Sequence, residues 1–461
     1  MSGGVRFKLF LMMVLEFFIW GAWLPLIFGY LPSLGFSADQ PPAALSGIFS
    51  NNLLKDVAWL FSEQSLILNA FPVAAIVGMF FSNQFADRNF AAEKFLGLSH
   101  LVGGLAILGL AFTTSFWVFF GLMLLHCLLY VPTISITNSI AFSQMKDPEK
   151  EFGLVRMGGT IGWILAAWPF VFIMVDWAKV SDANPQGLVE WLKTALGTPL
   201  TGDAAKAATR YSYIVAGVAS LALSGLSLLL PHTPPKKPAP GETSSSLAWL
   251  DSLRLLSSPF VMVLWIVALL DSFVHNCYFS WTGIFLSSPQ VGIPSNWVTP
   301  VMSIGQVAEI LTMFILGDVL KNLGWKWTMI IGVLGHAARF AIYAYFPQHP
   351  WLIILIQVVH GICYAFFFAT VYIFVDRYLP KHSRSSAQGL FNVMILGVGA
   401  LLAYSICPYL MQKVYTDPET KVVNFQQLFL VPMSVAILAG VMLLVAFWPP
   451  AEAAEEQAVS S

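Results

Sequence analysis

Twelve apolar segments, each about as long as a bilayer-spanning helix, constrain this sequence more than any other feature. A helix that crosses a membrane needs about 20 consecutive, mostly apolar residues. Such segments cover residues 8–34, 63–84, 94–114, 116–143, 153–176, 211–231, 259–286, 297–320, 326–346, 351–376, 384–412 and 425–448. Only 10% of the 461 residues are charged, whereas soluble domains carry about 25%. The sequence therefore predicts an all-α integral membrane protein with twelve transmembrane helices, and not an enzyme.

Composition excludes further classes of protein. The net charge of −1 supplies no field that attracts phosphates, so we expect no nucleic-acid partner. The four cysteines, at 127, 277, 363 and 407, all lie in apolar segments and lack metal-ligand spacing. We therefore expect neither a metal site nor a cofactor.

The distribution of Lys and Arg predicts the orientation in the membrane. With a cytoplasmic N-terminus, 15 of the 23 basic residues fall on the cytoplasmic side, 7 fall outside, and Arg339 lies within a segment. Cytoplasmic loops of membrane proteins carry such an excess of positive charge. We predict a multi-pass protein of the plasma (inner) membrane with both termini in the cytoplasm.

A proline- and serine-rich stretch at 231–246 divides the chain into two halves of six segments. We predict an N-terminal half at 1–230, a cytoplasmic linker at 231–258, a C-terminal half at 259–448 and a disordered acidic tail at 449–461. The halves echo each other, because Asp87 and Asp318 each precede a lysine that opens the next segment, Lys94 and Lys326. This pattern resembles the cytoplasmic signature of the major facilitator superfamily. Paired six-helix halves are typical of transporters whose site lies between them.

Polar side chains recur inside these segments at helical spacing. An ionisable group at membrane depth costs at least about 2.5 kcal/mol, so each one needs a reason. The stripes are Glu16, Trp20 and Trp23; Arg156, Thr160 and Trp163; Asp271, His275 and Asn276; Gln306 and Glu309; His336 and Arg339; and His360, Tyr364 and Phe367. Each of these side chains could instead hold helices together through hydrogen bonds. Together they favour a cavity for a neutral, polar, partly aromatic substrate, since Arg156 is the one firm cation that is a plausible member of the pocket.

Several motifs make the resemblance more specific. Residues 130–138 read YVPTISITN, 155–163 read VRMGGTIGW, 302–309 read MSIGQVAE and 384–391 read RSSAQGLF. With these motifs, nearly the whole chain resembles the nucleoside/proton symporter family of the major facilitator superfamily.

The resemblance implies a set of substrate-binding residues. They are Arg156, Thr160, Trp163, Asn276, Gln306, Glu309 and Tyr364. The chain departs from the family at three positions: Trp163 replaces a phenylalanine, Phe279 stands at a second amide, and Ala365 stands at an aspartate. The last two differences bear on the substrate range and on where a proton binds.

The resemblance also implies a mechanism, in which nucleosides enter by proton symport through alternating access. A monomer would bind the nucleoside within the bilayer, and H+ would be the coupling ion. Glu309 is the first candidate for the proton, and the others are Asp271, His275, His360 and Glu16. Two alternatives of the same fold remain open: a sugar/proton symporter and an uncoupled nucleoside facilitator.

The long loop at about 177–210 contains several apolar residues. A short helix at the membrane interface and a plain solvated loop are both compatible with this pattern.

Overall fold

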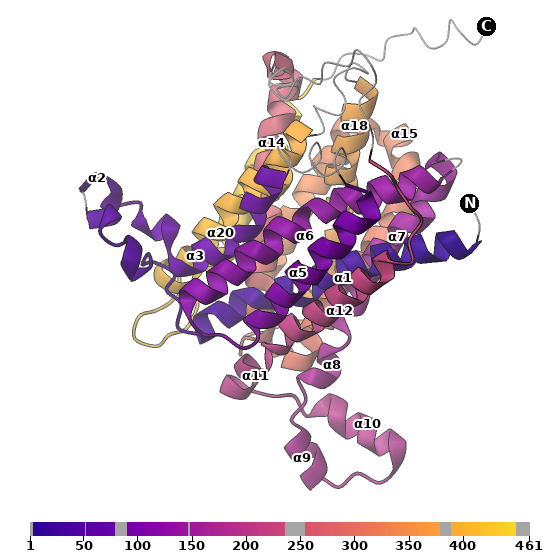
Figure 1. The fold of residues 1–461 in the computed structure, drawn as a ribbon. Coiled ribbons are helices and arrows are strands. Elements are labelled where there is room, and N and C mark those ends of the chain that lie inside the picture. Colours follow the sequence, from indigo (N-terminus) through magenta and orange to yellow (C-terminus); the bar gives the residue numbers. More distant parts are fainter. Residues whose placement is uncertain are drawn as a thin grey trace, which may run out of the picture.

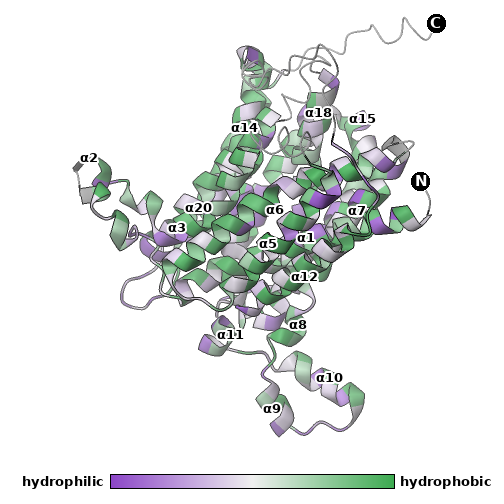
Figure 2. Ribbon diagram, viewed as in Figure 1, coloured by the Kyte–Doolittle hydropathy of each residue, from purple (hydrophilic) through white to green (hydrophobic). Residues whose placement is uncertain are grey.

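The computed structural model describes residues 3–50, 52–78, 90–145, 148–235, 254–378 and 389–448. The regular structure of these residues is helical, apart from isolated β-bridges between Val175 and Pro199 and between Thr416 and Val423. Nine helices in this part of the chain are long and apolar enough to cross a membrane. Hydrophobic residues dominate the bundle, whereas the short helices below it are more polar (Figure 2). An all-helical membrane fold, as predicted, is thus confirmed.

The bundle is built from the following helices, drawn in Figure 1: α1 (Gly3–Ser33), α3 (Glu63–Leu68), α5 (Ala92–Leu110), α6 (Phe116–Gln144), α7 (Pro148–Ala167), α8 (Phe170–Ile173), α12 (Tyr211–Ser227), α14 (Pro259–Ser287), α15 (Val298–Tyr345), α16 (Pro350–Leu355), α17 (Val359–Cys363), α18 (Thr370–Tyr378), α20 (Gly399–Tyr409) and α21 (Phe425–Ala446). Short helices outside the bundle are α2 (Asn52–Lys55), α9 (Trp177–Asp182), α10 (Gly187–Gly197) and α11 (Gly202–Ala208). Within the described ranges, three turns are π-helical: Tyr364–Ala369, Val393–Val398 and Leu410–Val414.

Two predicted segments, 297–320 and 326–346, lie in the single helix α15. The helix breaks between them at Gly324, which has φ 71° and ψ 173°. A residue with a side chain rarely adopts this backbone conformation, so glycine permits the sharp change of direction here.

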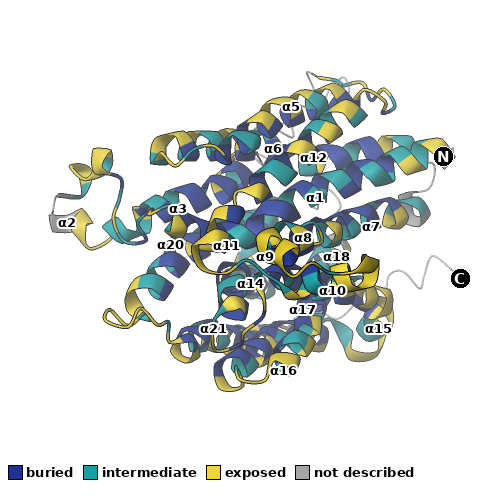
Figure 3. Cartoon of the chain, turned by 90° about the horizontal axis from the view of Figure 1, so that it is seen from below, coloured by how far each residue is buried: buried dark blue, intermediate teal, exposed yellow. Residues whose placement is uncertain are grey.

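The loop at 177–210 contains α9, α10 and α11, so the helical alternative describes it better than a plain loop. In a view from below, these helices lie across the middle of the bundle (Figure 3). Several predictions fall outside the described residues: Asp87 and its loop, most of the 231–258 linker, the start of segment 384–412, and the tail at 449–461.

The helices pack as two groups that meet along a few contacts. Helix α1 packs on α7 and α12, and α5 packs on α6 and α12; α15 packs on α17 and α21, and α14 packs on α20 and α21. Contacts of α1 with α14, of α7 with α15, and of α3 with α20 join the groups. Large apolar side chains lie on the outside of the bundle, as expected for surfaces that contact lipid. Phe112 and Phe314, for example, are each 76% exposed.

Polar contacts join the two groups at the end of the bundle that carries α9–α11. The side-chain amides of Gln64 and Gln412 bond to each other, and Asn69 Nδ2 donates to Ser405 Oγ over 2.8 Å. Lys413 Nζ lies 3.1 Å from Asp39 Oδ2. This end of the bundle is therefore closed by hydrogen bonds and an ion pair.

A second group of contacts seals the same end between α8–α10 and the start of α15. Ser295 Oγ donates to the carbonyl oxygen of Leu200 over 2.6 Å, and Trp297 Nε1 donates to that of Leu196 over 3.2 Å. Thr299 Oγ1 donates to the Ala167 carbonyl over 3.2 Å. The short helices of the 177–210 loop thus hold the beginning of α15 in place.

Candidate substrate site

A small pocket lies where α1, α7, α14 and α15 meet. It encloses about 10 Å³, close to the space of about one water molecule. Its lining residues are Gly21, Pro25, Trp163, Ala167, Tyr278, Phe279, Thr299, Met302, Ser303 and Gln306. The pocket therefore draws side chains from both groups of helices.

Two of the predicted substrate residues, Trp163 and Gln306, line this pocket. Gln306 is 6% exposed, and its Oε1 has no hydrogen-bond partner among the described residues. A buried amide oxygen without a donor is unfavourable by about 1–3 kcal/mol. Gln306 Oε1 can therefore accept a hydrogen bond from a molecule that enters the pocket.

Aromatic rings form a continuous row beside the pocket. Trp20 stacks on Phe71, with ring centroids 4.7 Å apart, and meets Trp163 edge-on at 5.2 Å. Trp163 in turn lies 5.9 Å from Phe279, which lies 5.2 Å from His275. The row runs from α1 through α7 to α14, and flat rings in this arrangement can stack against a planar base.

Arg156, Glu309 and Tyr364 form a second part of the predicted site, with each side chain half-buried. The charge of Arg156 interacts with both Glu309 and Tyr364. The Arg156 guanidinium also lies over the Phe17 ring, 4.3 Å from its centroid. These residues come from α7, α15 and the π-helical turn after α17, which lie close enough here for their charges and hydroxyls to interact.

Glycine permits the close approach of α15 and α17 that places Glu309. A methyl group added at Gly361 would overlap the backbone of Ala308 and Glu309. Close packing here keeps Glu309 next to the segment that contains Tyr364.

The remaining predicted substrate residues differ in their exposure to the pocket. Thr160 is half-buried on α7, between Arg156 and Trp163. Asn276 is 9% exposed, and its Nδ2 donates to the Ser272 carbonyl oxygen of its own helix over 2.8 Å. Ala365 is fully buried in an apolar cluster with Leu316 and Phe366. Asn276 therefore already has a partner for its donor, and position 365 has no polar surroundings in that cluster.

The structure only partly brings together Asp271, His275 and His360, three of the candidates for the proton. His275 and His360 stack with ring centroids 5.0 Å apart. The histidine next to Asp271, however, is His336, whose Nε2 lies 3.7 Å from Asp271 Oδ1. Arg339 binds both His336 and His360 through its guanidinium. The i, i+4 spacing of Asp271 and His275 places them on one face of α14 without making them partners.

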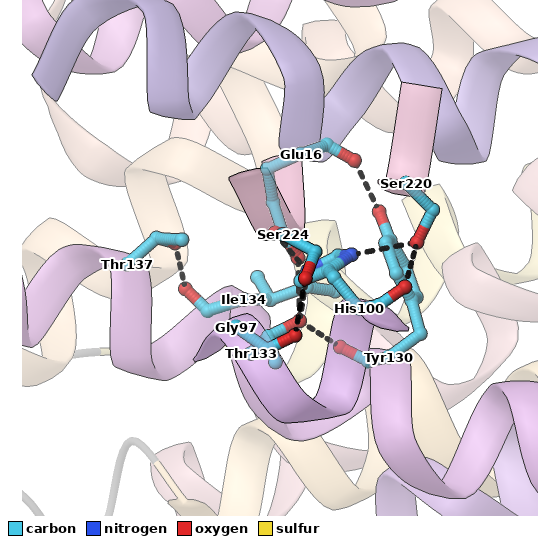
Figure 4. Close-up of polar contacts among 9 residues, drawn as sticks. All are labelled: Glu16, Gly97, His100, Tyr130, Thr133, Ile134, Thr137, Ser220 and Ser224. Atoms are coloured by element: carbon cyan, nitrogen blue, oxygen red, sulfur yellow. Dashed lines mark hydrogen bonds and ion pairs between the residues drawn. The ribbon is translucent and has the colours of Figure 1, made fainter. Parts of the chain in front are cut away.

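Glu16 lies in a separate polar network inside the first group of helices (Figure 4). His100 Nε2 lies 3.0 Å from Glu16 Oε2, and Thr133 Oγ1 donates to Glu16 Oε1 over 2.8 Å. His100 Nδ1 contacts Ser220 Oγ at 2.9 Å, and the Tyr130 hydroxyl donates to the Glu16 carbonyl oxygen over 2.6 Å. These residues join α1, α5, α6 and α12, and they do not line the pocket described above.

The sequence stripes did not include Tyr278, Met302 and Ser303, which also line the pocket. Ser303 lies three residues before Gln306, so the same helical spacing could have identified it. Among the described residues, no group of three or more His, Cys, Asp or Glu side chains is placed to hold a metal ion.

Comparison with known proteins reveals related sequences across the whole chain. The profile of the nucleoside H+ symporter family matches residues 3–58, 51–196 and 187–452. YegT of Escherichia coli (strain K12), named as a candidate nucleoside transporter, is 30% identical over 418 residues, which cover 89% of this chain and 86% of YegT. The nucleoside permease NupG of the same organism is 24% identical over 463 residues and covers 96% of this chain and 94% of NupG.

Solved structures share the fold. The crystal structure of the nucleoside transporter NupG superposes with a TM-score of 0.72 at 21% identity, covering 96% of this chain and 99% of that one. The crystal structure of a D-xylose–proton symporter has a TM-score of 0.64 at 14% identity, covering 96% and 98%. The sequence profile and the relatives together show that this chain belongs to the nucleoside H+ symporter family, whose members are membrane transporters and not enzymes.

Proposed function

We propose that this protein imports nucleosides by proton symport through alternating access. The observation that carries the proposal is a pocket lined by Trp163 and Gln306 at the contact of α1, α7, α14 and α15, in a chain of the nucleoside H+ symporter family. The proposal includes twelve transmembrane helices in two six-helix halves, at 1–230 and 259–448. Packing of the described helices as two groups supports this division.

The chemistry of the pocket suits a nucleoside. The base would stack in the row formed by Trp163 and Phe279, and its N–H groups would donate to Gln306 Oε1. Arg156 lies about two turns before Trp163 on α7, and Glu309 lies about one turn after Gln306 on α15. We propose that these two side chains bind the ribose hydroxyls. We propose that Thr160, Asn276 and Tyr364 complete the binding site, with Asn276 releasing its bond to Ser272 to do so.

A nucleoside is far larger than the 10 Å³ that the pocket encloses. The helices must therefore separate before a substrate enters. We propose that the end with α9–α11 faces the outside and that both termini lie in the cytoplasm of a cell with this protein in its plasma (inner) membrane. The Gln64–Gln412 and Asp39–Lys413 contacts would then close the outer entrance.

Transport follows from alternate closure of the two ends. When the outer contacts break, the substrate reaches the pocket from outside; when they form again, the opposite end opens. We propose that protons are the coupling ion and that Glu309, next to Arg156, binds the substrate. The proposal requires no cofactor and places the whole pathway within one chain, so a monomer suffices.

Uptake of labelled uridine into proteoliposomes tests the proposal. We expect accumulation above equilibrium when the outside is more acidic than the lumen, and simple equilibration when the pH is equal on both sides. Adenosine and uridine should compete for uptake, whereas xylose and glucose should not. Uptake that ignores the pH gradient would contradict symport, and competition by sugars alone would identify a sugar carrier of the same fold.

A further inference from the structure

Asp271 is a buried acid whose carboxylate lacks a donor. It lies within α14 and has no exposed surface. Neither Oδ1 nor Oδ2 has a hydrogen-bond partner among the described residues. A charged carboxylate in such a place is strongly unfavourable unless an opposite charge compensates it. Helix packing alone therefore does not explain why an acid is buried at this position.

Glu16 provides an internal comparison. It is equally buried, but His100 and Thr133 each contact one of its carboxylate oxygens. The protein thus holds two buried acids at membrane depth, one fully hydrogen-bonded and one without donors. The first arrangement is typical of a static contact between helices.

The charge near Asp271 comes from Arg339, which is also fully buried. Arginine stays protonated in proteins, so it brings a permanent positive charge into the helix group. Arg339 and Asp271 interact electrostatically. An ionised Asp271 compensates Arg339, and a protonated Asp271 leaves it without a counter-charge.

Hydrogen bonds from Arg339 determine which ring nitrogen carries the hydrogen in two histidines. Its Nη2 donates to His336 Nδ1 over 2.7 Å, and its Nη1 donates to His360 Nδ1 over 3.0 Å. A ring nitrogen that accepts from arginine carries no hydrogen, so both histidines are neutral with the hydrogen on Nε2. In His336, that Nε2–H lies next to Asp271 Oδ1, 3.7 Å away. A small movement would turn this contact into a hydrogen bond to an ionised carboxylate.

The cluster touches the wall of the pocket. The Arg339 guanidinium lies over the Tyr278 ring, 4.1 Å from its centroid, and Tyr278 lines the pocket. His275 lies one turn from Asp271 and packs against Phe279 of the same wall. A substrate that presses on Tyr278 and Phe279 would therefore displace the groups around Asp271.

Among the ionisable groups on the helices around α14, Asp271 is the carboxylate that belongs to the cluster with Arg339 and His336. Cys363 on α17 interacts with Asp271, and Tyr404 and Cys407 lie on the neighbouring α20. Helix α21, which also packs on α14, contains no Asp, Glu, Lys, Arg or His. On α1, Glu16 is held by its own partners. Glu309, on α15, interacts instead with Arg156 and Tyr364.

We infer that Asp271 is the carboxylate that carries the coupled proton, with His336 and Arg339 as its positioning residues; this inference rests on the proposed symport. A proton from the outer solution adds to one Asp271 oxygen and neutralises it. Arg339 then has no counter-charge, which favours the rearrangement of the pocket wall. Release of the same proton to the cytoplasmic solution restores the pair.

The variant D271N tests the inference in proteoliposomes. The amide keeps the shape of the side chain but cannot bind or release a proton. We expect uridine accumulation driven by a pH gradient to fall to the equilibrium level, and uridine-induced proton entry to disappear. Exchange of external label for preloaded uridine should stay within about twofold of the unmodified protein, since one state of the carboxylate supports exchange.

The variant E16Q is the matched control, because it makes the same change in a buried acid that has hydrogen-bond partners. We expect the folded fraction of E16Q to accumulate uridine when a pH gradient is applied, as the unmodified protein does. Accumulation by D271N at the level of the unmodified protein would overturn the inference, as would equal loss in both variants.

A second variant decides the case in which D271N does not fold. D271E retains a carboxylate at a different distance from His336 and Arg339, so the pH at half-maximal uptake should shift by at least about half a unit. An unchanged pH profile in D271E would overturn the inference. Failure of the unmodified protein to carry uridine would instead refute the proposed function itself.

Discussion

Gln64 and Gln412 donate hydrogen bonds to each other across the boundary between the two helix groups. Gln412 Nε2 lies 2.8 Å from Gln64 Oε1, and Gln64 Nε2 lies 3.1 Å from Gln412 Oε1. Gln64 also donates to the Phe36 carbonyl oxygen over 2.6 Å. The pair is thus a two-way amide contact fixed on one side by the backbone, and opening this end of the bundle must break it.

The variant Q412A should favour the form that is open at this end. Each lost hydrogen bond contributes about 1 kcal/mol, so two shift the opening equilibrium roughly 5–30-fold. The substitution S303C, in the lining of the pocket, reports opening through the reaction of its thiol with a membrane-impermeant maleimide. The four native cysteines are buried and give little background. Equal labelling rates with and without the Q412A change would contradict a closing role.

The Asp39–Lys413 pair should not contribute to pH dependence in the physiological range. Burial opposes ionisation, but hydrogen bonds from Ser37 and Lys413 outweigh it and lower the pKa of Asp39 from its ordinary value of 3.8. The carboxylate therefore stabilises closure above that pH, and the contribution is lost only as the pH falls through the still lower folded value. We expect D39N to open more readily while the pH profile of uridine uptake between about pH 5 and 8 keeps its shape. A flattened profile would assign proton sensing to Asp39.

Replacing Gln306 by alanine should weaken substrate binding more than it affects folding. The change removes an acceptor that has no partner among the described residues, so the free protein loses little. A lost hydrogen bond to a nucleoside corresponds to about 1 kcal/mol or more, which raises Kd about 5–10-fold. Titration calorimetry with uridine measures this change, and thermal unfolding serves as the control. An unaltered Kd would remove Gln306 from the binding site.

Gly361 should tolerate no side chain, in contrast to Gly317. An added methyl group at Gly361 would overlap the backbone next to Glu309, whereas at Gly317 it meets nothing within 4 Å. G361A should therefore push α17 away from α15, lower the unfolding temperature and reduce uridine uptake. G317A, which lies in α15, should leave uridine uptake unchanged and leave stability unchanged or raise it slightly. Similar behaviour of the two variants would argue against close packing as the factor that places Glu309.

The variant H100A should destabilise the first helix group without changing the pocket. It leaves Glu16 buried with Thr133 as its remaining side-chain partner. Leaving a buried carboxyl without one of its hydrogen-bond partners costs about 1–3 kcal/mol. Thermal unfolding in detergent should show a marked decrease, and the Kd for uridine of the folded fraction should not change. Weaker binding at unchanged stability would connect Glu16 with the substrate site.

The helical membrane fold could be predicted, and so could Trp163 and Gln306 of the pocket lining. Apolar length reveals membrane helices, and the spacing of Gln306 and Glu309 places them on one face of one helix. The resemblance to a known family linked these stripes to Arg156 and Trp163, which lie in the same region of the structure.

The partners of the buried acids could not be predicted. His100 is 84 positions from Glu16 in the sequence, and His336 is similarly distant from Asp271. Helical spacing places His275 on the same face as Asp271, but residues one turn apart need not touch. Which helix lies opposite depends on how all the helices pack together, and one sequence does not contain that information in local form. The break at Gly324, by contrast, lies close to where the two segments were separated.

The π-helical turns described above also affect where residues can be lost from the sequence during evolution. A π-helical turn holds an extra residue compared with an α-helical turn, so loss of one residue there would restore a regular helix. At any other position in a helix, the same loss rotates every later side chain by about 100°. The turn at Tyr364–Ala369 is therefore a place where evolution can remove a residue while His360 on one side and helix α18 on the other keep their faces. Relatives of different length in this segment can share one architecture, and residues with the same rank in an ungapped alignment need not occupy the same place in the membrane.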